Sequence, residues 1–146
     1  MKDIILATDG SVYSVEAARF VHEGNLLPEG GKVHVVHVSA PLSSRVAGFV
    51  GKQIIDDWHA DESAKAIEPV AEVLSAAGVP YETHAVVGQA ANEIVNLAER
   101  LNAKMIVMGA HGRGVFLDAV VGSVAGRVVS LSKCPVLLVT SKGKDK

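Results

Sequence analysis

Five short apolar runs, each separated from the next by a longer segment, constrain the fold of this 146-residue chain more than any other feature. Parallel strands cannot be joined by a tight turn, so each pair needs a crossover connection, usually a helix. Strands that helices cover on both faces are apolar along their whole length. The pattern therefore predicts a doubly wound α/β fold, in which a five-stranded parallel sheet carries helices on both faces. The expected strands are residues 4–7, 33–38, 81–87, 105–108 and 136–139.

Helical periodicity fills most of the segments between these runs. Ser11 or Ser14 can cap the first helix, which we expect to end near Asn25. Pro69 is expected to kink or divide the second helix, because proline removes a backbone donor. Small residues, one proline and two glycines indicate a mobile loop over residues 39–52. The further helices are expected over residues 54–77, 91–101 and 123–131. We expect one domain over residues 1–141, followed by a charged tail, residues 142–146.

Composition argues against several classes of function. A formal net charge of −2 and an aromatic content of 3 Phe, 2 Tyr and 1 Trp do not suit a general nucleic-acid binder. The single cysteine allows neither an intrachain disulfide nor a paired-cysteine motif. No uncharged apolar stretch approaches the length that crosses a bilayer. We therefore expect a cytoplasmic protein that binds neither nucleic acid nor membrane.

The histidines do not favour a transition-metal site when they are considered along the sequence. His34 and His37 lie three residues apart on an expected strand, so their side chains point to opposite faces of the sheet and cannot easily chelate one ion. His84 and His111 are distant from them in the sequence. Any metal ligands are therefore left unassigned.

A glycine-rich segment, residues 109–123 (GAHGRGVFLDAVVGS), directly follows an expected strand and ends where a helix begins. Its glycines allow a ligand to approach the backbone closely. The helix start near Ser123 offers unpaired amides and the positive end of a helix dipole, which favour phosphate. Arg113 is a candidate phosphate contact or a solvated loop charge. The segment is not a Walker A loop, because Val115 and Phe116 replace the lysine and the hydroxyl residue, and it contains no GxGxxG pattern.

Asp9 ends the first expected strand, at the edge of the sheet where ligands bind in this class of fold. Its carboxylate can contact a nucleotide or a metal ion. It can also serve only to form a turn with Gly10, since Asp-Gly is a common turn pair. Near the glycine-rich segment, Asp9 and His111 are the only groups suited to proton transfer. The sequence therefore offers few residues for efficient catalysis.

The spacing of Gly109, Gly112, Gly122 and Ser123 is G-x2-G-x9-G-S. In this pattern the chain resembles the ATP-binding branch of the universal stress protein family. The expected first strand with its acidic turn (IILATDGS), the second strand (HVVHVS) and the fifth (CPVLLV) are similar to those of the family as well. The resemblance covers nearly the whole chain. It implies the Rossmann-like fold of the adenine nucleotide alpha hydrolases, with strand order 3-2-1-4-5.

The resemblance implies an ATP site at the carboxyl edge of the first, second and fourth strands, with Mg²⁺ sharing the phosphate oxygens. Ala7 and Asp9, with the backbone of Val38, would hold adenine and ribose, and Met108 and Gly109 would flank the ribose. Two positions depart from the family pattern: Ala7 stands where many relatives have proline, and Val124 stands where some have serine. Neither change removes a backbone amide donor. The residues implied for the triphosphate are Gly112, Gly122, Ser123 and Val124.

By the same resemblance, the chain would be a small regulatory or sensor protein of the stress response that binds ATP. Family members commonly form homodimers by pairing their fifth strands, here residues 136–139. Two alternatives remain open. One is a slow ATP hydrolase or nucleotidyl transferase that uses the same site, and the other is a dimeric interaction module that ignores nucleotides.

Overall fold

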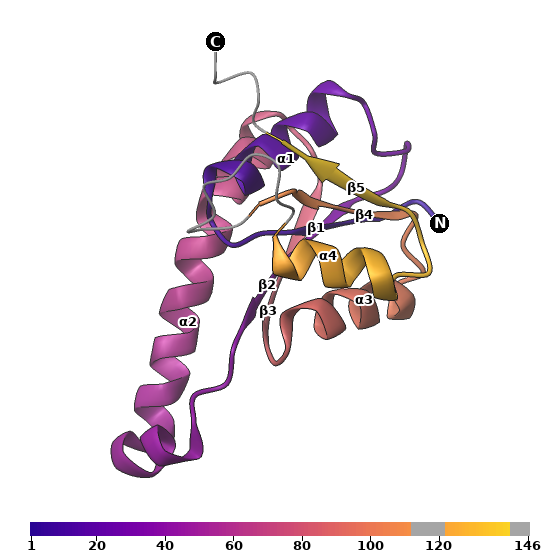
Figure 1. Ribbon diagram of the computed structural model, residues 1–146. Coiled ribbons are helices and arrows are strands. Elements are labelled where there is room, and N and C mark those ends of the chain that lie inside the picture. The colour runs from indigo at the N-terminus through magenta and orange to yellow at the C-terminus, as the bar shows by residue number, and fades with distance from the viewer. Residues whose placement is uncertain (112–121, 141–146) are drawn as a thin grey trace.

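A computed structural model describes residues 1–111 and 122–140, so the tail expected at residues 142–146 lies outside it. The described strands form one parallel sheet in the order β3-β2-β1-β4-β5 (Figure 1). The predicted fold class and strand order are thereby confirmed. The strands are β1 (Ile4–Ala7), β2 (Val33–Ser39), β3 (Tyr81–Val87), β4 (Met105–Gly109) and β5 (Val136–Val139).

Helices cover both faces of the sheet, as a doubly wound fold requires (Figure 1). The first two helices pack on one face, and the other two pack on the opposite face. No helix among the described residues combines the length and the apolar character needed to cross a membrane. The helices are α1 (Val12–Glu23), α2 (Ser44–Ala76), α3 (Ala90–Arg100) and α4 (Ser123–Leu131).

The central strand β1 explains why the apolar runs are continuous. Side chains alternate between the two faces of a strand, and both faces of β1 are buried. Ile4 and Leu6 pack toward α1 and α2, whereas Ile5 packs toward α3 and α4. All three side chains are fully buried. An alternating polar pattern would place a polar group in one of these two cores.

The prediction of a loop over residues 39–52 is wrong, because α2 begins at Ser44. Ser43 caps this helix, accepting a hydrogen bond from the Val46 amide at 3.3 Å. The helix is interrupted at Gly51, whose φ of 81° and ψ of 165° are not helical. It is not divided at Pro69, where the backbone remains helical. One missing donor is tolerated in a long packed helix, whereas glycine adopts a positive φ without the steric cost that a Cβ brings.

The strand order places a crevice at the carboxyl ends of β1 and β4. β2 and β3 lie in succession on one side of β1, whereas β4 and β5 lie on its other side. The connections that follow β1 and β4 therefore leave toward opposite faces of the sheet. Ligands of open α/β folds bind at such a switch point.

Candidate functional site

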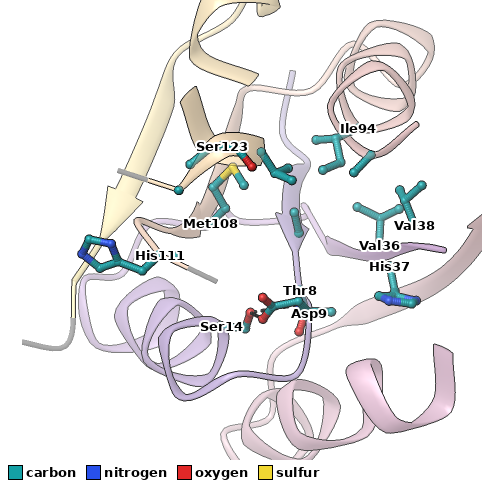
Figure 2. A pocket seen from close by; sticks show the side chains of 16 residues that line it. Thr8, Asp9, Ser14, Val36, His37, Val38, Ile94, Met108, His111 and Ser123 are labelled. Carbon is teal, nitrogen blue, oxygen red and sulfur yellow. Dashed lines mark hydrogen bonds between the residues drawn. The ribbon is translucent and has the colours of Figure 1, made fainter. Parts of the chain in front are cut away.

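A cavity of about 370 Å³ lies at this switch point, within the size range of small-molecule sites. Its lining comes from the carboxyl ends of β1, β2 and β4, from α1 and α3, and from the first turn of α4 (Figure 2). Eight residues that the sequence assigned to a ligand site line it together. They are Ala7, Asp9, Val38, Met108, Gly109, Gly122, Ser123 and Val124.

The remaining two assigned residues, Gly112 and Arg113, lie outside the described part of the chain. The cavity also has lining residues that sequence analysis did not assign to the ligand site. Thr8 and His37 lie next to assigned positions at the ends of their strands, so the strand-end rule could have found them. Ile94 comes from α3, and only the packing of that helix brings it to the cavity. The unassigned residues are Thr8, Ser14, Val36, His37, Ala90, Ile94, His111 and Ala125.

One wall of the cavity is apolar. Figure 2 shows Val36, Val38 and Ile94 on one side of it, with Met108 opposite. Val36 and Ile94 are buried, and both belong to the core beneath α3 and α4. An apolar cavity with a few convergent polar groups is the usual form of a site for a small organic ligand.

A hydrogen-bonded turn around Asp9 forms the polar floor. Asp9 Oδ1 accepts hydrogen bonds from the Ser11 amide at 2.9 Å and from the Ser14 hydroxyl at 3.0 Å. Ser14 Oγ in turn accepts from the Asp9 amide at 3.1 Å. The side chain of Asp9 therefore fixes the start of α1, which is the turn-forming role that its sequence position also allowed.

Thr8 connects this floor to the neighbouring helix. Its hydroxyl donates to the carbonyl oxygen of Ala66 in α2 at 2.9 Å and accepts from the Gly10 amide at 3.0 Å. Gly10 adopts a φ of 82°, which suits glycine at this turn. Thr8 is buried, and its bond to Ala66 is shielded from water, so the two bonds hold the turn in place.

The start of α4 forms the polar side of the cavity. Gly122 is its N-cap residue and offers no side chain to the amides of the first turn. The Gly122 amide donates to the Ala110 carbonyl oxygen at 2.8 Å, which ties this helix start to the end of β4. The first amides of a helix lack intrahelical acceptors and carry the positive end of its dipole. The first turn of α4 has no acidic residue, so the site suits an anion.

His111 adds a buried ring beside this helix start. The ring lies edge-on to Tyr13, with centroids 5.1 Å apart and an interplanar angle of 68°. Within the described residues its Nδ1 atom has no hydrogen-bond partner. Buried polar atoms are normally paired, so this nitrogen lacks the partner that such an atom usually has.

Comparison with known proteins gives consistent matches over the whole chain. The model of the universal stress protein family matches residues 1–140. Universal stress protein MJ0531 of Methanocaldococcus jannaschii is 34% identical over 151 residues, which cover 99% of this chain and 85% of that protein.

Two solved structures share the fold closely. The hypothetical protein MJ0577 from the same organism aligns with a TM-score of 0.80 at 27% identity, covering 95% of each chain. The universal stress protein of Archaeoglobus fulgidus, solved in complex with dAMP, aligns with a TM-score of 0.71 at 25% identity. That alignment covers 95% of this chain and 98% of that one.

Proposed function

Because the chain belongs to the universal stress protein family, we propose that it binds an adenine nucleotide, ATP, in the cavity beyond β1, β2 and β4. The observation that carries the proposal is the start of α4. Its glycine cap and unpaired amides face a cavity whose other wall is apolar. The dAMP complex of the Archaeoglobus fulgidus relative supports an adenine nucleotide as the ligand.

The base and the sugar occupy the apolar part of the cavity. Val36, Val38 and Ile94 offer a surface suited to the flat, largely apolar adenine ring. Ala7 and Asp9 lie at the end of β1, close to the sugar. Met108 and Gly109 flank the ribose from the end of β4. The residues that the family pattern implies for the base and the sugar all line this one cavity, as do Val36 and Ile94.

The phosphates lie at the start of α4. The amides of Ser123 and Val124 donate to phosphate oxygens, and the Ser123 hydroxyl adds another polar contact. Gly112 and Arg113, which are outside the described residues, complete the phosphate site by the family pattern. Asp9 and Ser123 both line the cavity and carry oxygen atoms of the kind that Mg²⁺ prefers, so the lining is compatible with a magnesium ion that binds chiefly to the phosphates.

The protein acts as a regulator or sensor in the stress response rather than as an efficient enzyme. The carboxylate of Asp9 already accepts two hydrogen bonds that form the start of α1, which does not suit a free general base. A slow hydrolase is the alternative that uses the same cavity. Release of ADP over many turnovers by the wild-type protein would favour that alternative.

The same proposal includes a homodimer formed through β5. This strand is one edge of the sheet, and its four residues, VLLV, are apolar and only partly buried. An apolar edge strand offers unpaired backbone groups, which another chain can pair with and cover. A second copy paired along β5 would do so and continue the sheet.

Thermal unfolding of nucleotide-stripped protein, titrated with ATP and Mg²⁺, tests the binding proposal. A ligand at 100 times its dissociation constant stabilises the native state by about 2.7 kcal/mol. For a domain of this size, that raises the melting temperature by roughly 5–10 °C. CTP, which has the same phosphates and no adenine, is the control and should shift it less. An unchanged melting temperature at millimolar ATP would contradict the proposal.

A further inference from the structure

A group of titratable side chains at the other edge of the sheet has no part in the nucleotide cavity. It brings together Asp3, which directly precedes β1, His34 near the start of β2, and Glu82 and His84 on the edge strand β3. The register pairs His34 with Glu82, and His84 lies two residues further along β3. Side chains two residues apart on a strand share a face, so the two histidines and Glu82 meet on one face of the sheet.

The facing atoms lie slightly closer together than the ligand atoms of a metal site. His34 Nδ1 is 2.9 Å from His84 Nε2, and His84 Nε2 is 3.6 Å from Glu82 Oε2. One nitrogen from each histidine and one oxygen of Glu82 all lie within 4.8 Å of one another. His34 is buried and His84 is partly buried, so the set lies at the margin of the core.

Asp3 orients the buried histidine. His34 Nε2 is 2.7 Å from Asp3 Oδ2, and the Lys32 amide donates to Asp3 Oδ1 at 3.1 Å. The hydrogen bond with His34 holds the pKa of Asp3 below its ordinary value, so the carboxylate is ionised and accepts the proton of Nε2. The Nδ1 lone pair of His34 then points toward His84 and Glu82. Histidines that bind metals typically donate their other ring N–H to a carboxylate in this way.

We propose that His34, His84 and Glu82 bind a Zn²⁺ ion, through Nδ1, Nε2 and Oε2, with water as the fourth ligand. Imidazole nitrogen and carboxylate oxygen are common zinc ligands, and three protein ligands with a water form a known type of zinc site. Tetrahedral coordination with Zn–N bonds of 2.0–2.1 Å separates two ligand nitrogens by about 3.3 Å. The histidine nitrogens, now 2.9 Å apart, need to separate by only a few tenths of an ångström.

The surrounding groups are compatible with this ion. Lys32 Nζ binds the other carboxylate oxygen of Glu82, Oε1, at 2.9 Å, so Oε2 remains directed at the histidines. Burial lowers the pKa of His84 below its ordinary value, and the nearby His34 lowers it further. Coordination of a metal needs the neutral imidazole ring. A bound ion would join β2 to the edge strand β3.

Zinc titration of the untagged full chain, freed of nucleotide and stripped of metal, tests this site. We expect one Zn²⁺ per chain, measured by competition with a chromophoric chelator. His84→Gln and Glu82→Gln should each weaken zinc binding by about tenfold or more. His22→Gln replaces an exposed histidine on α1 and serves as the matched control, with zinc affinity unchanged.

A second readout keeps the test independent of changes in folding. Co²⁺ bound in place of zinc should give the intense visible absorption of a four-coordinate site in the wild type and in His22→Gln, and not in His84→Gln. Wild-type zinc affinity in the folded His84→Gln protein would overturn the proposal, because the ion would then bind elsewhere. The absence of zinc binding to the wild type would also overturn it and leave His34 and His84 as a hydrogen-bonded pair.

Discussion

Gly109 lies so close to Tyr13 that a Cβ atom built on Gly109 would stand 2.6 Å from the Cβ atom of Tyr13. The glycine ends β4, and Tyr13 belongs to the first turn of α1, so the contact sets how closely the helix approaches the sheet. Gly109 is also the first glycine of the spaced motif. Packing alone therefore requires glycine here, whether or not a ligand also approaches it.

Gly109→Ala should destabilise the protein, because an added methyl group at this distance forces α1 and β4 apart. Overpacking of a core typically costs about 1–3 kcal/mol. Urea denaturation, read as the change in the unfolding midpoint, measures the effect. Gly126→Ala is the control, since a Cβ there meets nothing within 4 Å. Because Gly126 lies within α4, Gly126→Ala should raise the free energy of unfolding by about 0.5–1 kcal/mol. A midpoint for Gly109→Ala equal to that of the wild type would contradict the close contact.

Thr8→Val should weaken the floor of the cavity without changing side-chain shape. The substitution removes the hydroxyl that bonds both the Ala66 carbonyl oxygen and the Gly10 amide. Leaving a buried polar group unpaired costs about 1–3 kcal/mol in the free energy of unfolding. Thr83→Val, the same change on the exposed side of β3, should stay within about 0.5 kcal/mol of the wild type. Similar losses in the two variants would show that the bonds of Thr8 contribute nothing specific.

The homodimer proposal predicts a solution mass of twice the 15.2 kDa chain in light scattering. Hydrogen exchange can locate the contact. The carbonyl oxygens of Pro135 and Val139 accept hydrogen bonds from the amides of Ile106 and Ala110, so by strand alternation the amides of Val136 and Leu138 point to the open edge. Those two amides should exchange slowly in the dimer. A mass of one chain, or rapid exchange at both positions, would argue against pairing along β5.

The strands could be predicted from the sequence because glycine and proline mark their ends. Pro80 and Gly88 flank β3, and Pro135 directly precedes β5. Both strands have the predicted bounds. The same rule failed in α2. Glycines within residues 39–52 indicate a loop, yet within α2 only Gly51 departs from helical geometry. Whether a glycine ends a helix depends on the φ angle it adopts, which composition does not give.

Much of the candidate site could also be predicted, because the topology fixes which strand ends meet. Ala7, Val38 and Met108 share one cavity for this reason. Ile94 was missed because the packing of α3 on the sheet, rather than any motif, brings it there. Gly112 and Arg113 lie outside the described residues, and the assignment of all ten residues to a nucleotide remains a prediction.

The histidine cluster was missed for a different reason. Along the sequence, His34 is close to His37, on the same expected strand, whereas His84 lies 50 residues away on another strand. Pairing the expected second and third strands at their first residues, Val33 and Tyr81, would have placed His34 opposite Glu82. A single strand does not give its register with a neighbour, because the register is a property of the folded sheet. Pairing the predicted strands from their first residues is the signal that could have revealed the histidine cluster.

Calorimetric titration of ATP and Mg²⁺ into nucleotide-stripped wild type, Gly122→Asp and Gly122→Asn tests the central claim most directly. Aspartate and asparagine are both favourable N-cap residues, so both variants should keep α4 and differ mainly in charge. The account predicts that wild type and Gly122→Asn bind ATP, and that Gly122→Asp binds it at least about tenfold more weakly, a loss of about 1.4 kcal/mol. Equal ATP affinity in the two variants, or no binding to the wild type, would contradict it.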